Sequence, residues 1–199
     1  MEFQIKHVEV YGLDKSLIAS GNPMRTTMSD NRVCAVEADE IRGIMLAGTN
    51  PGAGHDNWLN GVIVQMDVYA PLYWWKQAQR YHWFDFISSQ STMHRAMSFS
   101  LDNAFVEDVD LRVINILSEI KMNYEMAEDS ETKQKLWKTF IATLPSGFVL
   151  AATMTTNYRQ LKTMYLQRRN HKLKEWRVFC EFCEELPLFK DIIAKLESK

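Results

Sequence analysis

The chain has 199 residues, 46% of them hydrophobic, which is enough for one sizeable core. Its net charge of -2 excludes a general attraction to nucleic acid or to an anionic membrane. No apolar run approaches the roughly 18 residues that cross a bilayer, and the opening Met-Glu-Phe-Gln-Ile-Lys lacks the features of a secretory signal. We therefore expect one cytoplasmic domain over residues 1–199 that binds neither nucleic acid nor membrane.

The first third of the chain shows strand and helix patterns in turn. Residues 3–11 alternate polar and apolar side chains, as a strand does. Asp14 is placed to cap a short helix, and residues 36–47 have the spacing of an amphipathic helix. Residues 61–70 alternate again, which predicts a second strand with one buried face. Pro71 ends this strand and can open a helix, because its missing N–H falls where a helix has no partner.

The remainder of the chain is mostly helical in pattern. We expect a polar loop after Trp83 and a helical hairpin at about residues 111–144, where two stretches carry broad apolar stripes. Residues 148–155 predict a further strand, and Asn157 begins the next helix. Together these elements predict an α/β (α+β) fold with a mainly antiparallel sheet flanked by helices.

The cysteines give no sign of a metal site. Their number is three, and an odd number in a chain of this kind indicates reduced thiols. Cys180 and Cys183 form a Cys-x-x-Cys pair inside a helical pattern, without a second pair or a nearby histidine. A metal there would lack ligands, so we expect both thiols to be buried for packing and expect no metal.

The helix that begins at Asn157 carries polar side chains at a helical interval. Asn157 and Arg168 are eleven residues apart, which is three turns with about 20° left over. The two should therefore lie on one face, roughly 16 Å apart, with Leu161 and Met164 between them. That span suits a ligand with a ring at one end and a phosphate at the other.

A second polar stretch surrounds the strand at residues 61–70. His55 precedes it, a Lys-Gln pair ending at Gln77 follows it, and Arg80 and Ser91 come next. This order resembles the signature region of the flavin-dependent thymidylate synthases. In that family a histidine precedes the strand, an Arg-Gln pair opens the helix, an Arg-His-Arg triplet closes it, and Asn-Glu-x-Ser-x-Arg-Tyr follows.

The triplet can be aligned in two ways. Counted forward from the end of the strand it falls on residues 80–82, which keeps Arg80. Counted backward from Ser91 it falls on residues 81–83, which keeps His82. Under either alignment the Asn-Glu pair and the arginine after the serine are replaced by other residues.

A second block resembles the same family more specifically. The family has the segment Thr-x-Asn-Leu-Arg-x-Leu, followed by six further residues and then another arginine. Asn157, Arg159 and Arg168 match its three polar positions without a gap. In the family the asparagine and the first arginine contact flavin, and the last arginine binds the nucleotide.

The resemblance implies a flavin-dependent methyltransferase of nucleotide biosynthesis that methylates dUMP at uracil C5. It implies FAD as cofactor, NADPH as reductant, methylenetetrahydrofolate as co-substrate and a homotetramer whose sites use several chains. Gln77, Ser91 and Arg168 would bind the nucleotide, with Ser91 and Arg168 in the catalytic role. The residues implied to contact FAD are His55, Arg80, His82, Asn157 and Arg159.

Two alternatives stay open. The altered triplet and the missing arginine after Ser91 motivate a divergent flavoenzyme that modifies another uracil nucleotide. The second alternative is a non-catalytic relative that binds nucleotides and has lost flavin.

Overall fold

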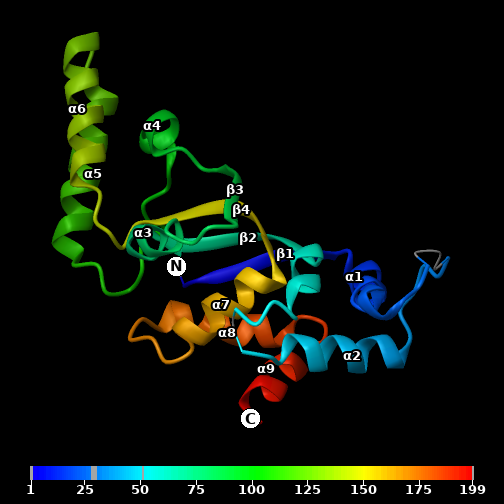
Figure 1. Cartoon of the computed structure of the whole chain (residues 1–199). Helices are drawn as coiled ribbons and strands as arrows, with labels where there is room; N and C mark the ends of the chain where they lie inside the picture. Colours follow the sequence, from blue (N-terminus) through cyan, green and yellow to red (C-terminus); the bar gives the residue numbers. More distant parts are fainter. Residues whose placement is uncertain (1, 28–30, 51, 199) are drawn as a thin grey trace. The chain divides into compact units, whose positions relative to one another are not determined.

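The computed structural model describes residues 2–27, 31–50 and 52–198 (Figure 1). By its internal contacts this chain divides into two compact units. We call them the hairpin unit and the main unit. The hairpin unit holds the residues up to Gln4, Val68–Ala78 and Phe86–Thr153, and the main unit holds Ile5–Asp67, Gln79–Asp85 and the residues from Met154 onward. The expectation of a single domain over residues 1–199 stays a prediction.

In the described residues four strands form one sheet in the order β1-β2-β4-β3. The amide of Tyr158 donates to the carbonyl of Val62 at one end of the central pair, and that of Leu72 donates to Phe148 at the other, so β2 and β4 run antiparallel. The predicted α+β class with a mainly antiparallel sheet is thereby confirmed. The strands are β1 Gln4–Tyr11, β2 Ile63–Pro71, β3 Phe84–Ser89 and β4 Val149–Asn157.

β2 follows the predicted alternation along its length. Val64, Met66, Val68 and Ala70 are buried, and the residues between them are half-buried. The strand starts later than the pattern suggests, because residues 57–61 form a short 3-10 helix. A period of two with one face fully covered is what fixes the register of this central strand.

The prediction of a polar loop after Trp83 is wrong, because β3 occupies residues 84–89. Phe84 is buried and the other five residues are exposed, so the strand has no alternating hydrophobic signal. Pairing just beyond its end shows why the chain is extended here. Gln90 donates its amide to the carbonyl of Ala151 at 3.0 Å, and its side-chain carbonyl accepts from the Ala151 amide at 2.9 Å.

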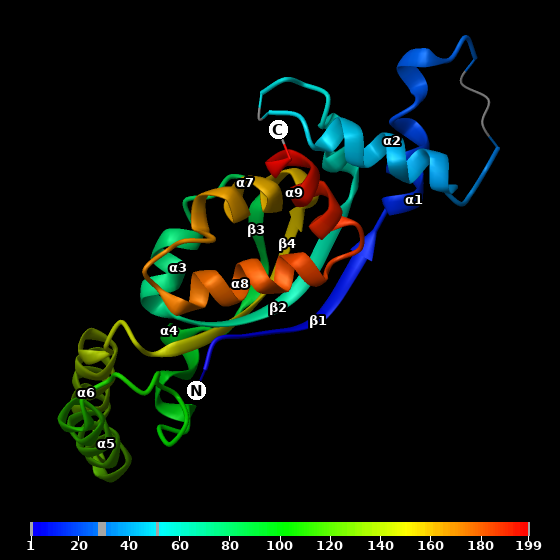
Figure 2. The same ribbon diagram turned by 90° about the horizontal axis from the view of Figure 1, so that it is seen from below.

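The helices of the main unit pack as neighbours around a largely aromatic core. α8 lies against both α7 and α9, and α9 also contacts α2 (Figure 2). Phe179 of α8 packs edge-on against Trp176 at 5.7 Å and against Phe84 of β3 at 6.0 Å. The helices are α1 Leu13–Ala19, α2 Glu37–Ala47, α7 Tyr158–Arg168, α8 Lys174–Glu185 and α9 Phe189–Glu197, with 3-10 turns η1 Asn22–Met24 and η2 Asn57–Gly61.

Asp14 does not cap α1 as expected. The N-cap is Gly12, and the Asp14 carboxylate instead accepts a hydrogen bond from the Ala35 amide at 2.7 Å. Gly12 has a φ of 75°, and a β-carbon there would meet the carbonyl oxygen of Gly61 at 2.5 Å. This close approach requires glycine and moves the helix start away from the aspartate.

Both α8 cysteines are buried, as expected. Cys180 is 3% exposed and Cys183 is fully buried, and both are free thiols. Burial raises the pKa of Cys180 to about 12, and burial also raises the pKa of Cys183 well above its usual value. The pair therefore serves packing, since a protonated, covered thiol is a poor nucleophile and metal ligand.

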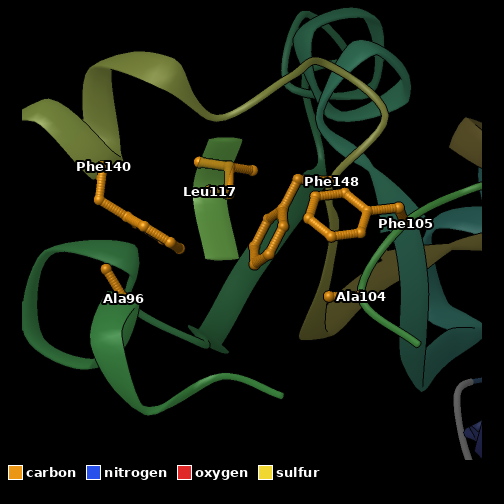
Figure 3. Close-up of a cluster of buried hydrophobic side chains, with 6 residues drawn as sticks. All are labelled: Ala96, Ala104, Phe105, Leu117, Phe140 and Phe148. Carbon is orange, nitrogen blue, oxygen red and sulfur yellow. The ribbon is translucent and has the colours of Figure 1, made fainter. Parts of the chain in front are cut away.

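The hairpin unit is built on α5 and α6, which lie side by side (Figure 1). Asp110 and Asp129 cap the two helices by accepting from the amides of Arg112 and Thr132. A buried cluster joins the hairpin to β4, with the rings of Phe105 and Phe148 adjacent (Figure 3). The remaining helices here are α3 Leu72–Ala78 and α4 Thr92–Arg95, followed by η3 Ala96–Ser98, α5 Leu111–Met126 and α6 Ser130–Thr143. Within the described ranges we find no helix with the length and apolar content to cross a membrane.

A buried carboxylate, that of Asp39, lies at the start of α2. Asp39 is 2% exposed and accepts hydrogen bonds from Arg42 at 2.5 Å, Arg32 at 2.7 Å and the Val36 amide at 3.1 Å. Burial alone would raise the pKa of this carboxyl, but the three donors lower it to about 2. Its contribution to stability is therefore present above the unfolded pKa and is lost as the pH falls towards 2.

Replacing Asp39 with asparagine should lower the free energy of unfolding at pH 7 by about 1–2 kcal/mol. It should also flatten the pH dependence of stability between about pH 4 and pH 2, where the wild-type carboxylate gains its proton. Urea unfolding at a series of pH values measures both effects. An equally steep acid limb in Asp39→Asn would show that other carboxylates control acid unfolding.

Candidate ligand-binding site

A pocket of about 220 Å³ lies at the beginning of α7 in the main unit. Asn157 ends β4 and caps α7, its side-chain oxygen accepting from the Gln160 amide at 2.9 Å. The predicted helix start at Asn157 is thus correct, and the same carboxamide faces the pocket. The lining residues are Asn60, Trp83, Asn157, Arg159, Gln160 and Thr163.

A buried ion pair lies next to Arg159. The ammonium of Lys162 contacts the Asp56 carboxylate at 3.0 Å, and both side chains are at most 4% exposed. Lys162 also donates to the carbonyls of Ala47 at 2.5 Å and Thr49 at 3.3 Å, which uses all three of its N–H groups. The other carboxylate oxygen of Asp56 is 3.4 Å from Nε of Arg159. One buried carboxylate therefore serves two cations, and the second of them reaches the pocket.

Trp83 combines two unfavourable features at the pocket wall. Its side chain is 59% exposed, and its backbone φ of 65° lies in the left-handed region. That conformation costs about 1–2 kcal/mol for a residue with a side chain. The ring of His82 lies beside the indole at 4.8 Å, inclined by 69°. Strain of this kind in a bulky residue is concentrated at functional positions in proteins.

Arg168 is held between two aromatic rings at the end of α7. Its guanidinium carbon is 4.7 Å from the ring centre of Trp176 and 5.4 Å from that of Tyr81. Its Nε also donates to the Tyr81 hydroxyl at 2.7 Å, and that hydroxyl donates to Gln167 at 2.9 Å. Cation–π contact plus a hydrogen bond fixes the orientation of the guanidinium. We refer to Tyr81, Trp176 and Arg168 as the arginine clamp.

The clamp also affects a neighbouring histidine. His171 lies edge-on to Trp176, with ring centres 6.3 Å apart. Partial burial lowers the pKa of His171, and the positive charge of Arg168 adds to the effect. The imidazole therefore stays neutral at physiological pH, so the local positive charge comes from the arginines.

The pocket and the arginine clamp are separate features of α7. Leu161 and Met164, which lie between Asn157 and Arg168 on the helix face, are fully buried. The face is thus packed into the core, and the ring-to-phosphate span expected between the two ends has no exposed path along it. A ligand that contacts both Asn157 and Arg168 would have to run outside the buried face that contains Leu161 and Met164.

The other predicted residues are distributed over both units. His55, Arg80 and His82 are exposed parts of the main unit. Gln77 and Ser91 belong to the hairpin unit and are half-buried. The Ser91 hydroxyl accepts from the His94 amide at 3.2 Å and so caps α4. Of the predicted residues, Asn157 and Arg159 line one pocket in the main unit, and the roles of all the predicted residues stay predictions.

Comparison with known proteins gives a match only at the level of structure. No protein-family model matches the chain. No characterised protein matches it by sequence. The flavin dependent thymidylate synthase ThyX from Helicobacter pylori, complexed with FAD and dUMP, matches with a TM-score of 0.67 over 96% of this chain and 99% of that chain, at 16% identity. The chain has the fold of the flavin-dependent thymidylate synthases.

A second structure supports the same assignment of fold. Thymidylate Synthase X from Helicobacter pylori with FAD and dUMP has a TM-score of 0.67 and 16% identity, covering 99% of each chain. The family resemblance inferred from the two motif blocks is therefore confirmed for the flavin-dependent thymidylate synthase fold. The pocket at the start of α7 and the arginine clamp are features of this chain on that fold.

Sequence reasoning missed the groups that surround the predicted residues. Trp83 carried one signal, since one alignment of the triplet ends on it, but its left-handed backbone has no local sequence pattern. Lys162 and Asp56 are 106 residues apart, so their pairing exists only in the fold. Tyr81 and Trp176 lie in aromatic-rich segments that look like ordinary core. Among the described residues no cluster of histidine, cysteine, aspartate or glutamate is arranged to hold a metal ion.

Proposed function

We propose that the protein is a flavin-dependent methyltransferase that binds FAD and dUMP. It would take a one-carbon unit from methylenetetrahydrofolate and form thymidylate, with NADPH reducing the flavin. The observation that carries the proposal is the pocket at the start of α7, where Asn157 and Arg159 share a space with the exposed indole of Trp83. The solved relatives with this fold are complexed with FAD and dUMP.

The pocket residues suit a planar, anionic cofactor such as FAD. The indole of Trp83 offers a surface for a flat ring. Arg159 has a permanent positive charge, and its side chain is 38% exposed. Asn157, Asn60 and Gln160 add amide donors and acceptors. The volume of about 220 Å³ is below the roughly 300–1,000 Å³ of pockets that enclose a whole ligand. One part of FAD would bind here, and neighbouring chains of a homotetramer would cover the rest.

FAD, when bound, supplies the hydride of the reaction. The chain's own residues would bind and orient the nucleotide. Arg168 is held in a fixed orientation by the clamp and suits a phosphate or a developing negative charge on the pyrimidine. Ser91 accepts one hydrogen bond through its oxygen and keeps its own proton, which can be donated to a uracil carbonyl. Gln77 would add an amide contact to the same nucleotide, and His55, Arg80 and His82 would contact FAD from exposed positions.

The proposal is tested by a spectrum and a turnover assay. Purified protein incubated with FAD and freed of excess should keep the visible absorption band of bound flavin. Incubated with dUMP, methylenetetrahydrofolate and NADPH, it should then form thymidylate, detected by mass spectrometry. Protein that stays colourless would favour the non-catalytic relative.

The replacement of the arginine after the serine by Met93 favours a second candidate, a flavoenzyme for another uracil nucleotide. The assay therefore includes other uracil nucleotides beside dUMP. Product from one of these and none from dUMP would reject the dUMP assignment while keeping the flavin assignment.

A further inference from the structure

We propose that Trp83 is the stacking residue for a planar ring of FAD in the pocket at the start of α7. The inference rests on the proposed flavin function and adds to it Trp83, a residue that is given no contact by the resemblance although one alignment of the triplet ends on it. Its basis is the combination of exposure, backbone strain and surroundings at this one tryptophan.

Trp83 is far more exposed than the four buried tryptophans of this chain. Trp83 is 59% exposed. A buried indole would remove apolar surface from water, and this chain buries the ring of the very next aromatic residue, Phe84, against Phe179. The hydrophobic core therefore reaches the residue next to Trp83, and yet the Trp83 indole stays exposed. The tryptophans that are at most 8% exposed are Trp58, Trp74, Trp75 and Trp176.

The backbone at Trp83 is held in an unfavourable conformation. Its φ of 65° belongs to the region that glycine and asparagine adopt readily and bulky residues avoid. This conformation precedes β3 directly and separates the exposed indole from the buried ring of Phe84. A glycine would make the same turn without strain, so packing alone does not explain a tryptophan here.

The rest of the pocket complements a flat ring that carries polar atoms. Nε of Arg159 lies 3.4 Å from the buried Asp56 carboxylate, an ion pair without a hydrogen bond, and Asn157 accepts its capping bond from the Gln160 amide. Asn157 is therefore held by a partner before a ligand arrives, and the charge of Arg159 is balanced by a carboxylate beside the pocket. The ring of His82 is inclined by 69° to the indole and so does not take a parallel stacking position.

The test compares ligand affinities of wild type, Trp83→Phe and Trp83→Leu by calorimetric titration with FAD, FMN and ADP. Leucine keeps apolar bulk but has no ring face, so FAD affinity should fall about 10- to 100-fold, as for other lost aromatic stacking contacts. Phenylalanine should keep affinity within about threefold. Phe86→Leu serves as the matched control, since Phe86 is another exposed aromatic close by in sequence that does not line this pocket. It should leave affinity unchanged.

A spectroscopic readout separates stacking from a general loss of structure. An indole stacked on a flavin quenches flavin fluorescence, so bound FAD should be dim in wild type and brighter in Trp83→Leu at saturating protein. A loss shared by FAD and FMN identifies the flavin ring as the partner, and a loss shared by FAD and ADP identifies the adenine. Thermal melting of each variant confirms that it is folded.

The outcomes distinguish this inference from the function on which it rests. Wild-type protein that binds no FAD would overturn both. Wild type that binds FAD, with Trp83→Leu binding equally well and with equal flavin fluorescence, would overturn the stacking role alone. A similar loss in Phe86→Leu would also overturn it, because the effect would then not be specific to the pocket.

Discussion

Replacing Lys162 with methionine should lower the free energy of unfolding by about 3–5 kcal/mol. The lysine ammonium holds the Asp56 carboxylate and two backbone carbonyls, and its side chain is 3% exposed. Methionine has a similar length but donates no hydrogen bond, so the buried carboxylate would keep only Arg159, at 3.4 Å. Urea unfolding followed by circular dichroism measures the change.

Two further variants make this prediction specific. The double variant Lys162→Met with Asp56→Asn should recover part of the lost stability, because no unpaired charge is then left in the interior. Lys172→Met, at an exposed position, should stay within about 0.5 kcal/mol of wild type. If Lys162→Met also stays within that range, the buried pair does not hold the main unit together.

Replacing Arg168 with alanine should weaken the binding of dUMP by about 1.5–3 kcal/mol, which is roughly 10- to 150-fold. The clamp places a permanent charge in one orientation, and alanine removes both the charge and its contacts with Tyr81 and Trp176. Arg168→Lys should recover only part of the affinity, since an ammonium lacks the planar fork that stacks and bonds in pairs. Calorimetric titration of the FAD-loaded protein with dUMP measures each affinity.

The adjacent arginine provides the control for this experiment. Arg169 forms an ion pair with Glu197 at the end of α9 and does not belong to the clamp. Arg169→Ala should therefore leave dUMP affinity unchanged, although it carries the same loss of charge. Equal losses in both variants would mean that general attraction, and not the clamp, binds the nucleotide.

The periodicity of hydrophobic residues was sufficient to predict an element where that element has one buried face. β2 and the caps at Asn157 and Asp129 follow from alternation and from capping chemistry, and the structure has them where these patterns place them. β3 was missed because only Phe84 of its six residues is buried. An edge strand of this kind is defined by backbone pairing, which leaves little trace in side-chain type.

The polar residues at the pocket could be predicted from the sequence, but the residues that surround and hold them could not. The spacing of Asn157 and Arg159 relative to the helix start puts both at the pocket. The fixed positions of Arg159 and Arg168 depend on Asp56, Tyr81 and other residues far away in sequence, and such pairings arise only when the chain is folded. The same applies to burial: Leu161 and Met164 looked like a ligand-facing surface on the helix, and they are core.

The ammonium of Lys162 bonds to two points of the chain, Thr49 and Asp56, which enclose the segment that contains His55. It holds the carbonyl of Thr49 on one side and the carboxylate of Asp56 on the other. Gly52 and Gly54, between these points, have open space around an added side chain, although both have positive φ. Lengthening a segment tied at both ends costs only about 0.6 kcal/mol for each doubling. The stretch that contains His55 can therefore vary in length and sequence at little cost to the buried ion pair between Lys162 and Asp56.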